Sequence, residues 1–489
     1  MAASKSRPEP PLQSPIPFHH GSNGEYVPRE PGERVRRSEE LFRAMVDERS
    51  KRLGKTRREF IDSMAGTATA LFVINQIGCG GNGGGSDGDG GFQVDASSTW
   101  DADQACEELG GDQFVFDVQT HHVNPDGAWR QNNPGWAFFF QSLPQASCGE
   151  ADAVDCFDTE NYLREMFINS DTHVAVLSAV PADPGENPLE IAEQKATMDL
   201  VAQLSGSQRL VIHGLVLPDQ GQAQIDGMQA LVEEMNISAW KVYTPYGGWN
   251  LTDTAGTLFL EEAERLGVSI VCAHKGLPLP GFNPAFASPQ DIGVVAVDHP
   301  DLRFVVYHSG YETEVTEGPY DPDGQGIDRL IRTCEMNGIG PSDNVYAELG
   351  STWRNVMTDP TQAQHVIGKL LKHLGADRIV WGTDSIWYGS PQDQITAFRA
   401  LSISEQMQDD HGYPALTAEV KAKILGLNAA ALYGIDIEAT RCAIDEGDLA
   451  QLRRQIRDEG TAVPSFRAYG PATRREFFSF LRSRGGRPG

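Results

Sequence analysis

The stretch FDVQTHHV, residues 116–123, places three polar side chains at alternate positions, namely Asp117, Gln119 and His121. In a β-strand these side chains share one face, because successive side chains point to opposite faces. Two histidines at this spacing can reach one metal ion, but the first position here is Gln119. The stretch predicts a metal site with one ligand replaced, a site that has lost its metal, or an ordinary strand. His122 lies on the opposite face and is not expected to be a ligand.

The composition of the 489-residue chain is that of a globular protein, with 40% hydrophobic and 8% aromatic residues. Its formal net charge is −28. Binding to nucleic acid requires a basic face for the phosphates, so this charge argues against a nucleic-acid partner. We expect a small-molecule substrate and membrane contact only through a signal or a lipid anchor, and a homo-oligomer stays open.

Seven cysteines are spread along the chain, and none forms a CxxC pair, which argues against a thiolate zinc site. Cys148 and Cys156 lie in one polar stretch, so they can pair if the compartment is oxidising. Cys272 lies in an apolar run and is expected to be a small buried residue.

The N-terminal region has the pattern of an export signal. Residues 1–55 are rich in Pro, Gly, Ser and charge and are expected to be disordered. In residues 56–79, TRREFI matches the twin-arginine pattern and precedes a short apolar run. This run is too short to span a membrane as a stable helix. The sequence therefore predicts export by the twin-arginine route.

Two outcomes of export remain open. QIGCGG resembles a lipoprotein cleavage site, which would put a lipid on Cys79, although Gln76 stands where such sites prefer an aliphatic residue. Residues 80–111 then form a Gly-rich linker that suits a tethered domain. The alternative is a soluble periplasmic protein cleaved nearby. Residues 436–489 are expected to form a C-terminal helical extension, which includes a basic amphipathic helix at TRREFF.

Residues 112–435 alternate eight apolar, strand-like runs with helical patterns. The runs cover residues 114–118, 173–180, 210–216, 239–244, 269–274, 303–308, 344–349 and 378–384. Continuous apolar runs separated by helices indicate parallel strands that are buried on both faces. Eight such units predict a (β/α)8 TIM barrel. An open doubly wound sheet is the alternative, but no Gly-x-Gly-x-x-Gly follows any run.

Polar residues gather at the C-terminal ends of these runs, which is the rim where barrel enzymes build their active sites. They are Gln119, His121, Lys241, Tyr243, His274, His308, Glu348 and Asp384. One histidine alone more often serves structure, but side chains from several strand ends that meet on one rim favour a site.

The order of these motifs resembles the amidohydrolase superfamily, in particular its amidohydrolase-related branch of metal-dependent hydrolases and non-oxidative decarboxylases. The resemblance covers about residues 112–435. It depends on FDVQTHHV, VCAHKG, FVVYHSG, WGTDS and the closing ILGLNAAALYG. His173 and His213 lie outside these motifs and receive no role.

The resemblance implies one divalent metal, Zn²⁺ first and Mn²⁺ as the alternative. Its ligands would be His121, His274 and Asp384, with Gln119 as a weaker ligand or an outer partner. His308 would orient the water or assist proton transfer, and Asp384 would accept the water's proton. Imidazole and carboxylate ligands suit such a cation and lower the pKa of a bound water to about 7.

Substrate contacts are expected from Lys241, Tyr243 and Trp387. In some relatives a fourth-strand lysine is carboxylated and bridges two metals, but Gln119 weakens the case for a second metal. An unmodified Lys241 that contacts an anionic substrate is our interpretation.

The sequence thus predicts an exported metal-dependent hydrolase that cleaves a C–N or C–O bond in a small carboxylated or aromatic substrate. One alternative is a metal-dependent decarboxylase on the same scaffold. The other is an inactive, surface-tethered binding protein, which Gln119 and the Gly-rich linker motivate.

Overall fold

The fold is that of a computed structural model, which describes residues 13–19, 30–78, 91–278, 282–458 and 473–483. Eight parallel strands form one sheet in sequential order, β2 to β9, which confirms the TIM barrel. The strands are β2 (Val115–Thr120), β3 (Thr172–Leu177), β4 (Leu210–Leu215), β5 (Ala239–Val242), β6 (Ile270–His274), β7 (Arg303–Tyr307), β8 (Val345–Glu348) and β9 (Ile379–Val380).

The barrel closes between its first and last strands through backbone hydrogen bonds. Val118 N donates to Trp381 O at 2.9 Å, and Asp384 N donates to Gln119 O at 3.0 Å. His121 N donates to the carbonyl of Ser385 at 2.6 Å. The last strand was expected to cover residues 378–384, but only Ile379 and Val380 form a regular strand. Beyond them the chain still bonds to β2, so the two site-bearing segments are joined by their backbones.

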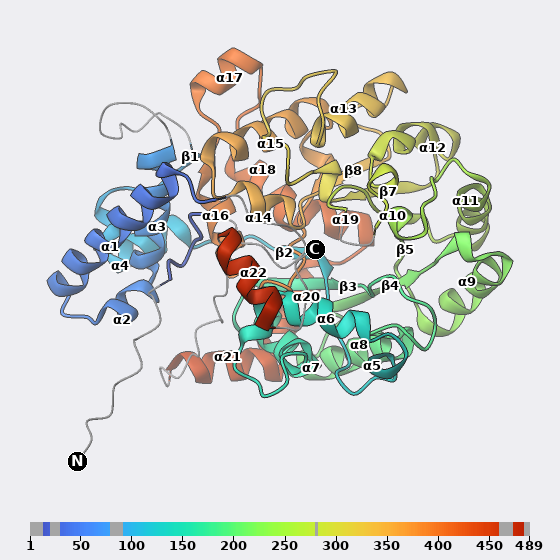
Figure 1. Ribbon diagram of the computed structural model, residues 1–489, viewed down its shortest axis with the longest axis horizontal. Coiled ribbons are helices and arrows are strands. Elements are labelled where there is room, and N and C mark those ends of the chain that lie inside the picture. The colour runs from blue at the N-terminus through green and yellow to red at the C-terminus, as the bar shows by residue number, and fades with distance from the viewer. Residues whose placement is uncertain (1–12, 20–29, 79–90, 279–281, 459–472, 484–489) are drawn as a thin grey trace.

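Helices cover the outside of the barrel between consecutive strands (Figure 1). After β2 come α5 (Trp129–Asn132), α6 (Pro134–Ser142) and α7 (Thr159–Leu163). The later units contain α8 (Ile191–Ser205), α9 (Gln222–Met235), α10 (Thr244–Gly247), α11 (Thr254–Leu266), α12 (Ile292–Asp298), α13 (Ile327–Met336), α14 (Thr352–Val356), α15 (Pro360–His373) and α16 (Gln392–Ala400). Strands β4 to β9 are buried along their length, apart from the exposed first residue of β7 and the partly exposed last residue of β4. Burial of this kind is expected for strands that other elements cover on both faces.

The N-terminal region differs from the expected disorder over residues 1–55. Residues 33–52 form helix α1 (Glu33–Arg52), whose Phe42, Met45 and Val46 are buried against α3 (Met64–Gly78). These apolar residues are spaced three and four apart, which gives α1 one apolar face. The charged and Pro-rich composition of the region led to the prediction of disorder, so this apolar face was not recognised in the sequence.

The residues expected to form a linker at 80–111 are also structured from residue 91 onwards. Strand β1 (Gly91–Phe92) pairs with β10 (Leu401–Ser402), and α4 (Ala102–Leu109) packs against α3. Asn75 holds both backbone groups of Phe92 through its side-chain amide. Ala105 and Leu109 are buried, so this segment belongs to a helical unit on the flank of the barrel (Figure 1). Cys79 and residues 80–90 lie outside the described residues.

The twin-arginine segment forms the short helix α2 (Arg57–Ile61). Thr56 and Glu59 make a reciprocal capping box at its start, and both Arg57 and Arg58 are exposed. In the part of the chain that the structure describes, no helix has both the length and the apolar character needed to cross a membrane.

The barrel domain ends with α17 (Glu405–His411), α18 (Ala418–Ala422) and α19 (Asn428–Tyr433). The C-terminal extension then contains α20 (Ile437–Glu446), α21 (Asp448–Asp458) and α22 (Arg474–Ser483). Arg453 of α21 pairs with Asp171 at 2.8 Å, which ties this helix to the segment before β3.

Cys148 and Cys156 form a disulfide in the long connection between β2 and β3. The sequence left open whether these two cysteines pair, and the bond closes the loop of residues 148–156 between α6 and α7.

Asp117 supports the closure of the barrel and provides the first prediction. Its buried carboxyl accepts hydrogen bonds from Gln119 N and Thr383 N, each at 3.1 Å, and from the Thr383 hydroxyl. Asp117→Ala leaves these donors unsatisfied, so we expect a loss of roughly 2–4 kcal/mol in the free energy of unfolding. Unfolding in urea measures this free energy for both the parent protein and the variant. Asp112→Ala, at an exposed position nearby, is the control, and an equal effect of both variants would contradict the role of Asp117.

Candidate active site

One pocket at the C-terminal ends of the strands collects most of the predicted site residues. Its cavity is about 40 Å³. Its lining consists of Gln119, His121, Phe139, Val180, Pro181, Tyr243, His274, Leu277, His308, Ser351, Asn355, Asp384, Trp387 and Tyr388. Two larger hollows, of about 500 and 300 Å³, contain none of the predicted residues.

Unusual backbone conformations are concentrated in this pocket. His308, Ser309, Ser351 and Asp384 all have φ between 52° and 65°. The left-handed region costs a non-glycine residue roughly 1–3 kcal/mol, and such residues cluster at functional sites. Each one lies in a segment that follows a strand, and His308, Ser351 and Asp384 also line the pocket.

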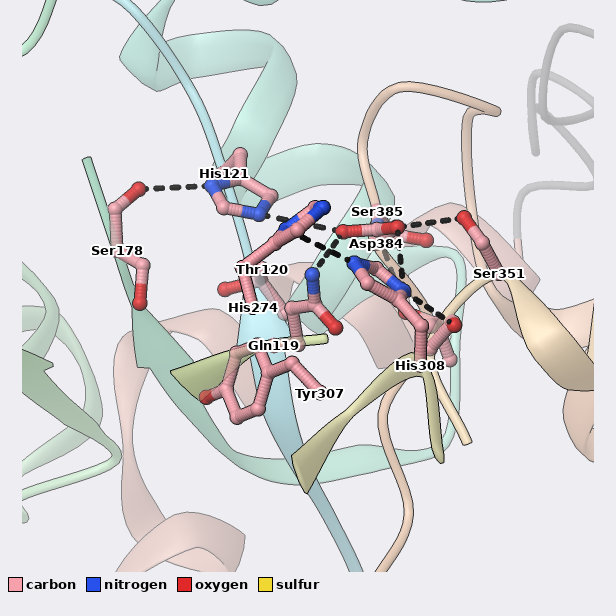
Figure 2. Close-up of polar contacts among 12 residues, drawn as sticks. Gln119, Thr120, His121, Ser178, His274, Tyr307, His308, Ser351, Asp384 and Ser385 are labelled. Atoms are coloured by element: carbon pink, nitrogen blue, oxygen red, sulfur yellow. Dashed lines mark hydrogen bonds and ion pairs between the residues drawn. The ribbon is translucent and has the colours of Figure 1, made fainter. Parts of the chain in front are cut away.

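Asp384 lies at the centre of the cluster (Figure 2). His121 Nε2 lies 3.3 Å from its Oδ1 and His308 Nδ1 lies 3.7 Å from its Oδ2, while the amide of Gln119 and the hydroxyl of Ser351 donate to it. Burial alone would raise the pKa of Asp384, but His308, His121 and the hydroxyl of Ser351 together hold that pKa well below its usual value. The carboxylate is therefore ionised.

The three pocket histidines each have one nitrogen against a backbone carbonyl. His121 Nδ1 lies 2.8 Å from Ser178 O, and His308 Nδ1 lies 2.8 Å from Gly350 O. His274 Nε2 lies 3.1 Å from the carbonyl of Leu277. A carbonyl oxygen can only accept, so each of these nitrogens carries the hydrogen. In the neutral rings the opposite nitrogens are then bare acceptors.

These bare nitrogens face one another and Asp384. His308 Nε2 lies 3.3 Å from His274 Nδ1, and His121 Nε2 faces the carboxylate. Burial lowers the pKa of both His274 and His308, and the Asp384 carboxylate opposes this effect at both rings. Several nitrogen and oxygen acceptors therefore lie close together. In this cluster the side-chain NH₂ group of Gln119 donates a hydrogen bond to Asp384. This arrangement is costly unless a cation lies between the acceptors.

The donor set therefore fits a divalent cation in chemical kind, since neutral imidazoles and a carboxylate are ligands of Zn²⁺ and Mn²⁺. Among the residues that the structure describes, no three His, Cys, Asp or Glu side chains already stand in an arrangement that could hold a metal ion. The donors are closed onto one another instead, and a cation would replace those contacts.

Glu348, at the end of β8, supports the backbone of two segments that carry the site. Its side chain is fully buried and accepts from His308 N at 2.9 Å and from Gly350 N. Burial, with a further contribution from Asp384, raises the pKa of Glu348 well above its usual value. Glu348 thereby fixes the turn that aims His308 into the pocket.

Lys241 differs from the expectation that it contacts substrate. Its side chain is fully buried beneath the pocket and does not line it. The Nζ atom lies 3.3 Å from the centre of the Tyr307 ring and has no hydrogen-bond partner. Burial lowers the pKa of Lys241 to about 7. The sequence placed Lys241 among the polar residues of the rim, but it did not show how deep the side chain lies.

Tyr243 and Trp387 do line the pocket, as expected. The Trp387 ring stacks on His121 with a centroid distance of 4.9 Å. Tyr243 packs against His274 at 5.2 Å, and its hydroxyl donates to Ala179 O. Both aromatic rings therefore hold a histidine in place as well as forming a wall.

Ser351 and Phe139 were missed. Ser351 donates to Asp384, and its hydroxyl lies 3.0 Å from the hydroxyl of Tyr388. It lies three residues after the end of β8. The position of a small polar residue at a strand end was the available signal. Phe139 comes from α6, far from any strand, and no sequence pattern placed that helix over the pocket.

Comparisons with known proteins agree with this architecture. A family model described as amidohydrolase matches residues 144–435, which is more than half of the chain. The chain therefore belongs to the amidohydrolase family, as the sequence motifs indicated. No curated protein is similar enough in sequence to count as a relative.

Solved structures with a similar fold include 5-carboxyvanillate decarboxylase from Sphingomonas paucimobilis, at 14% identity and a TM-score of 0.43, which covers 66% of this chain and 100% of that one. Another is 2,6-dihydroxybenzoate decarboxylase from Rhizobium, at 18% identity and 0.39, with coverage of 66% and 100%. A third is 5-carboxyvanillate decarboxylase from Novosphingobium aromaticivorans with bound manganese, at 12% identity and 0.45, with coverage of 67% and 98%. Similarity at this level does not identify the reaction of this chain.

Lys241 provides a prediction about stability. The unfolded chain protonates this lysine below pH 10.5, whereas burial keeps the folded pKa near 7, so the folded state loses stability as pH falls through that interval. Lys241→Met keeps the volume and removes this cost. We expect it to raise the free energy of unfolding by roughly 2–4 kcal/mol at pH 6.5 and by less at pH 9.5. Denaturant unfolding at both pH values measures this. A variant that is less stable at pH 6.5 would show that Lys241 has a charged partner.

Proposed function

We propose that the chain is a metal-dependent hydrolase that cleaves a C–N or C–O bond in a small substrate. The observation that carries this proposal is that three histidines and the ionised Asp384 meet in one pocket at the rim of the barrel. His121 Nε2 faces Asp384, and the bare nitrogens of His274 and His308 face each other.

His121, His274 and Asp384 would hold the cation, with Gln119 beside them. The cation, when bound, lowers the pKa of a water and polarises the substrate's carbonyl oxygen. Zn²⁺ is our first expectation and Mn²⁺ the alternative. The remaining chemistry belongs to the side chains around it.

Proton transfer would be shared between Asp384 and His308. Asp384 is ionised and can accept the proton of the attacking water. His308 donates a hydrogen bond from Nδ1 to Gly350 O, so its bare Nε2 is the ring atom that is available for proton transfer. His308 Nε2 would take over the proton that Asp384 received from the water and deliver it to the leaving nitrogen or oxygen, so that the net transfer is from the water to the leaving group.

The walls of the pocket favour a small aromatic or apolar substrate. Phe139, Tyr243, Trp387 and Tyr388 supply ring faces, and Leu277 adds an aliphatic contact. Among the described residues that line the pocket, none is Lys or Arg. This supports a neutral substrate group over an anionic one and changes the earlier expectation that Lys241 would bind a carboxylate.

A decarboxylase would use the same donor set without a hydrolytic water. Reactions with a panel of aryl amides, esters, lactones and hydroxybenzoates in ¹⁸O-labelled water separate the two. A hydrolase places one ¹⁸O atom in the new carboxyl or hydroxyl group. Release of CO₂ without label in the product would instead establish the decarboxylase.

The metal requirement is the prediction that separates an enzyme from an inactive binding protein. We expect about one equivalent of Zn²⁺ or Mn²⁺ per chain after purification without chelators, measured by elemental analysis. Asp384→Asn should reduce both the metal content and kcat/KM, the latter by roughly 100-fold or more. His122→Asn is the control, because His122 is buried nearby but bonds to Thr197, and it should retain its metal. Well under one equivalent in the parent protein would support the binding protein.

Export by the twin-arginine route is also part of the proposal. It is supported by the exposed Arg57 and Arg58 and by the Cys148–Cys156 disulfide, which oxidising compartments favour. Fractionation of cells that express the full chain tests it. The parent protein should leave the cytoplasm, and a variant with both arginines changed to lysine should stay there. Equal distribution of the two would refute this route.

A further inference from the structure

The side-chain amide of Gln119 lies between two buried carboxyl groups. Its Nε2 donates to Asp384 Oδ1, whereas its Oε1 has no hydrogen-bond partner although the residue is only 2% exposed. A buried acceptor without a donor costs free energy, so this half of the amide is unsatisfied in the structure.

The unsatisfied oxygen faces Gly350 and Glu348. A Cβ atom at Gly350 would overlap both Gln119 Oε1 and Glu348 Oε1, so the two oxygens crowd one position that only a glycine leaves open. The carbonyl oxygen of Gln119 therefore lies beside a second oxygen and receives no hydrogen bond.

Rotation of the amide by about 180° about its last bond exchanges the two atoms at little steric cost, because this torsion is broad and nearly two-fold. The NH₂ group would then face Glu348, whose carboxyl group retains free acceptor capacity. The oxygen would face Asp384 and the bare Nε2 of His121. That orientation is unfavourable when no cation is present, since it adds one more acceptor to the cluster.

We propose that Gln119 is a two-position ligand. In the metal-free site its NH₂ group takes the place of the cation beside Asp384. When a cation binds, the amide turns, its oxygen faces the cation and its NH₂ group donates to Glu348. This inference goes beyond the proposed function and depends on it, because it requires the same cation site.

The consequence is a shift in metal preference. An amide oxygen is a harder and weaker donor to Zn²⁺ than an imidazole nitrogen, but an acceptable ligand for Mn²⁺. Gln119 therefore narrows the advantage of Zn²⁺ over Mn²⁺ relative to a site with histidine at this position.

Competition measurements of the dissociation constants for Zn²⁺ and Mn²⁺ test this preference. Gln119→His should tighten Zn²⁺ at least tenfold relative to Mn²⁺. Gln119→Met, which keeps the length and removes the amide, should weaken Mn²⁺ about tenfold. Gln145→Met is the matched control, since Gln145 is another buried glutamine whose Oε1 has no partner, and it should leave both constants unchanged.

The rotation itself is visible by NMR of protein labelled with ¹⁵N in its glutamine side chains. The Gln119 NH₂ signals are identified by their loss in Gln119→Met. Saturation with Zn²⁺, which is diamagnetic, should move them while they remain protected from exchange. Unmoved signals, or an unchanged ratio of the two constants in Gln119→His, would overturn the inference. If the parent protein binds neither cation, the proposed function fails as well, whereas binding with an unchanged ratio refutes the role of Gln119 alone.

Discussion

The backbone seam between β2 and β9 is the constraint on which the site depends. Asp384 N donates to Gln119 O, and His121 N donates to Ser385 O, so the first and last strands are joined at the residues that carry the chemistry. Without this seam, residues more than 260 positions apart in the sequence would not share a pocket. Asp117 strengthens it one pair further down, through Thr383.

The seam also explains why so much strain is tolerated at one place. Five non-glycine residues with positive φ lie in or beside the pocket, namely Leu277, His308, Ser309, Ser351 and Asp384, and hydrogen bonds hold them in place. Glu348 accepts from His308 N, Thr352 donates to His308 O, and Ser309 donates to Glu348 O. A rigid barrel can maintain these conformations because its strands are buried on both faces and cannot slide.

The barrel and most of the site could be predicted from the sequence, because both depend on local patterns. Eight buried apolar runs specify the strands, and polar residues at their ends specify the rim. The apolar face of α1 was hidden by its charged composition, and the position of α6 over the pocket depends on packing between distant segments. The depth of Lys241 and the unsatisfied oxygen of Gln119 depend on the orientation of these side chains within the fold. That orientation could not be predicted from the sequence pattern.

We propose that the bare nitrogens of His121 and His274 and the carboxylate of Asp384 lie in one pocket because they bind a divalent cation. Anomalous X-ray scattering from crystals grown with Zn²⁺ or Mn²⁺ tests it directly. We expect one strong anomalous peak in contact with these three side chains and with the side-chain oxygen of Gln119. Full-occupancy peaks only elsewhere on the protein, or no peak at saturating metal, would contradict it.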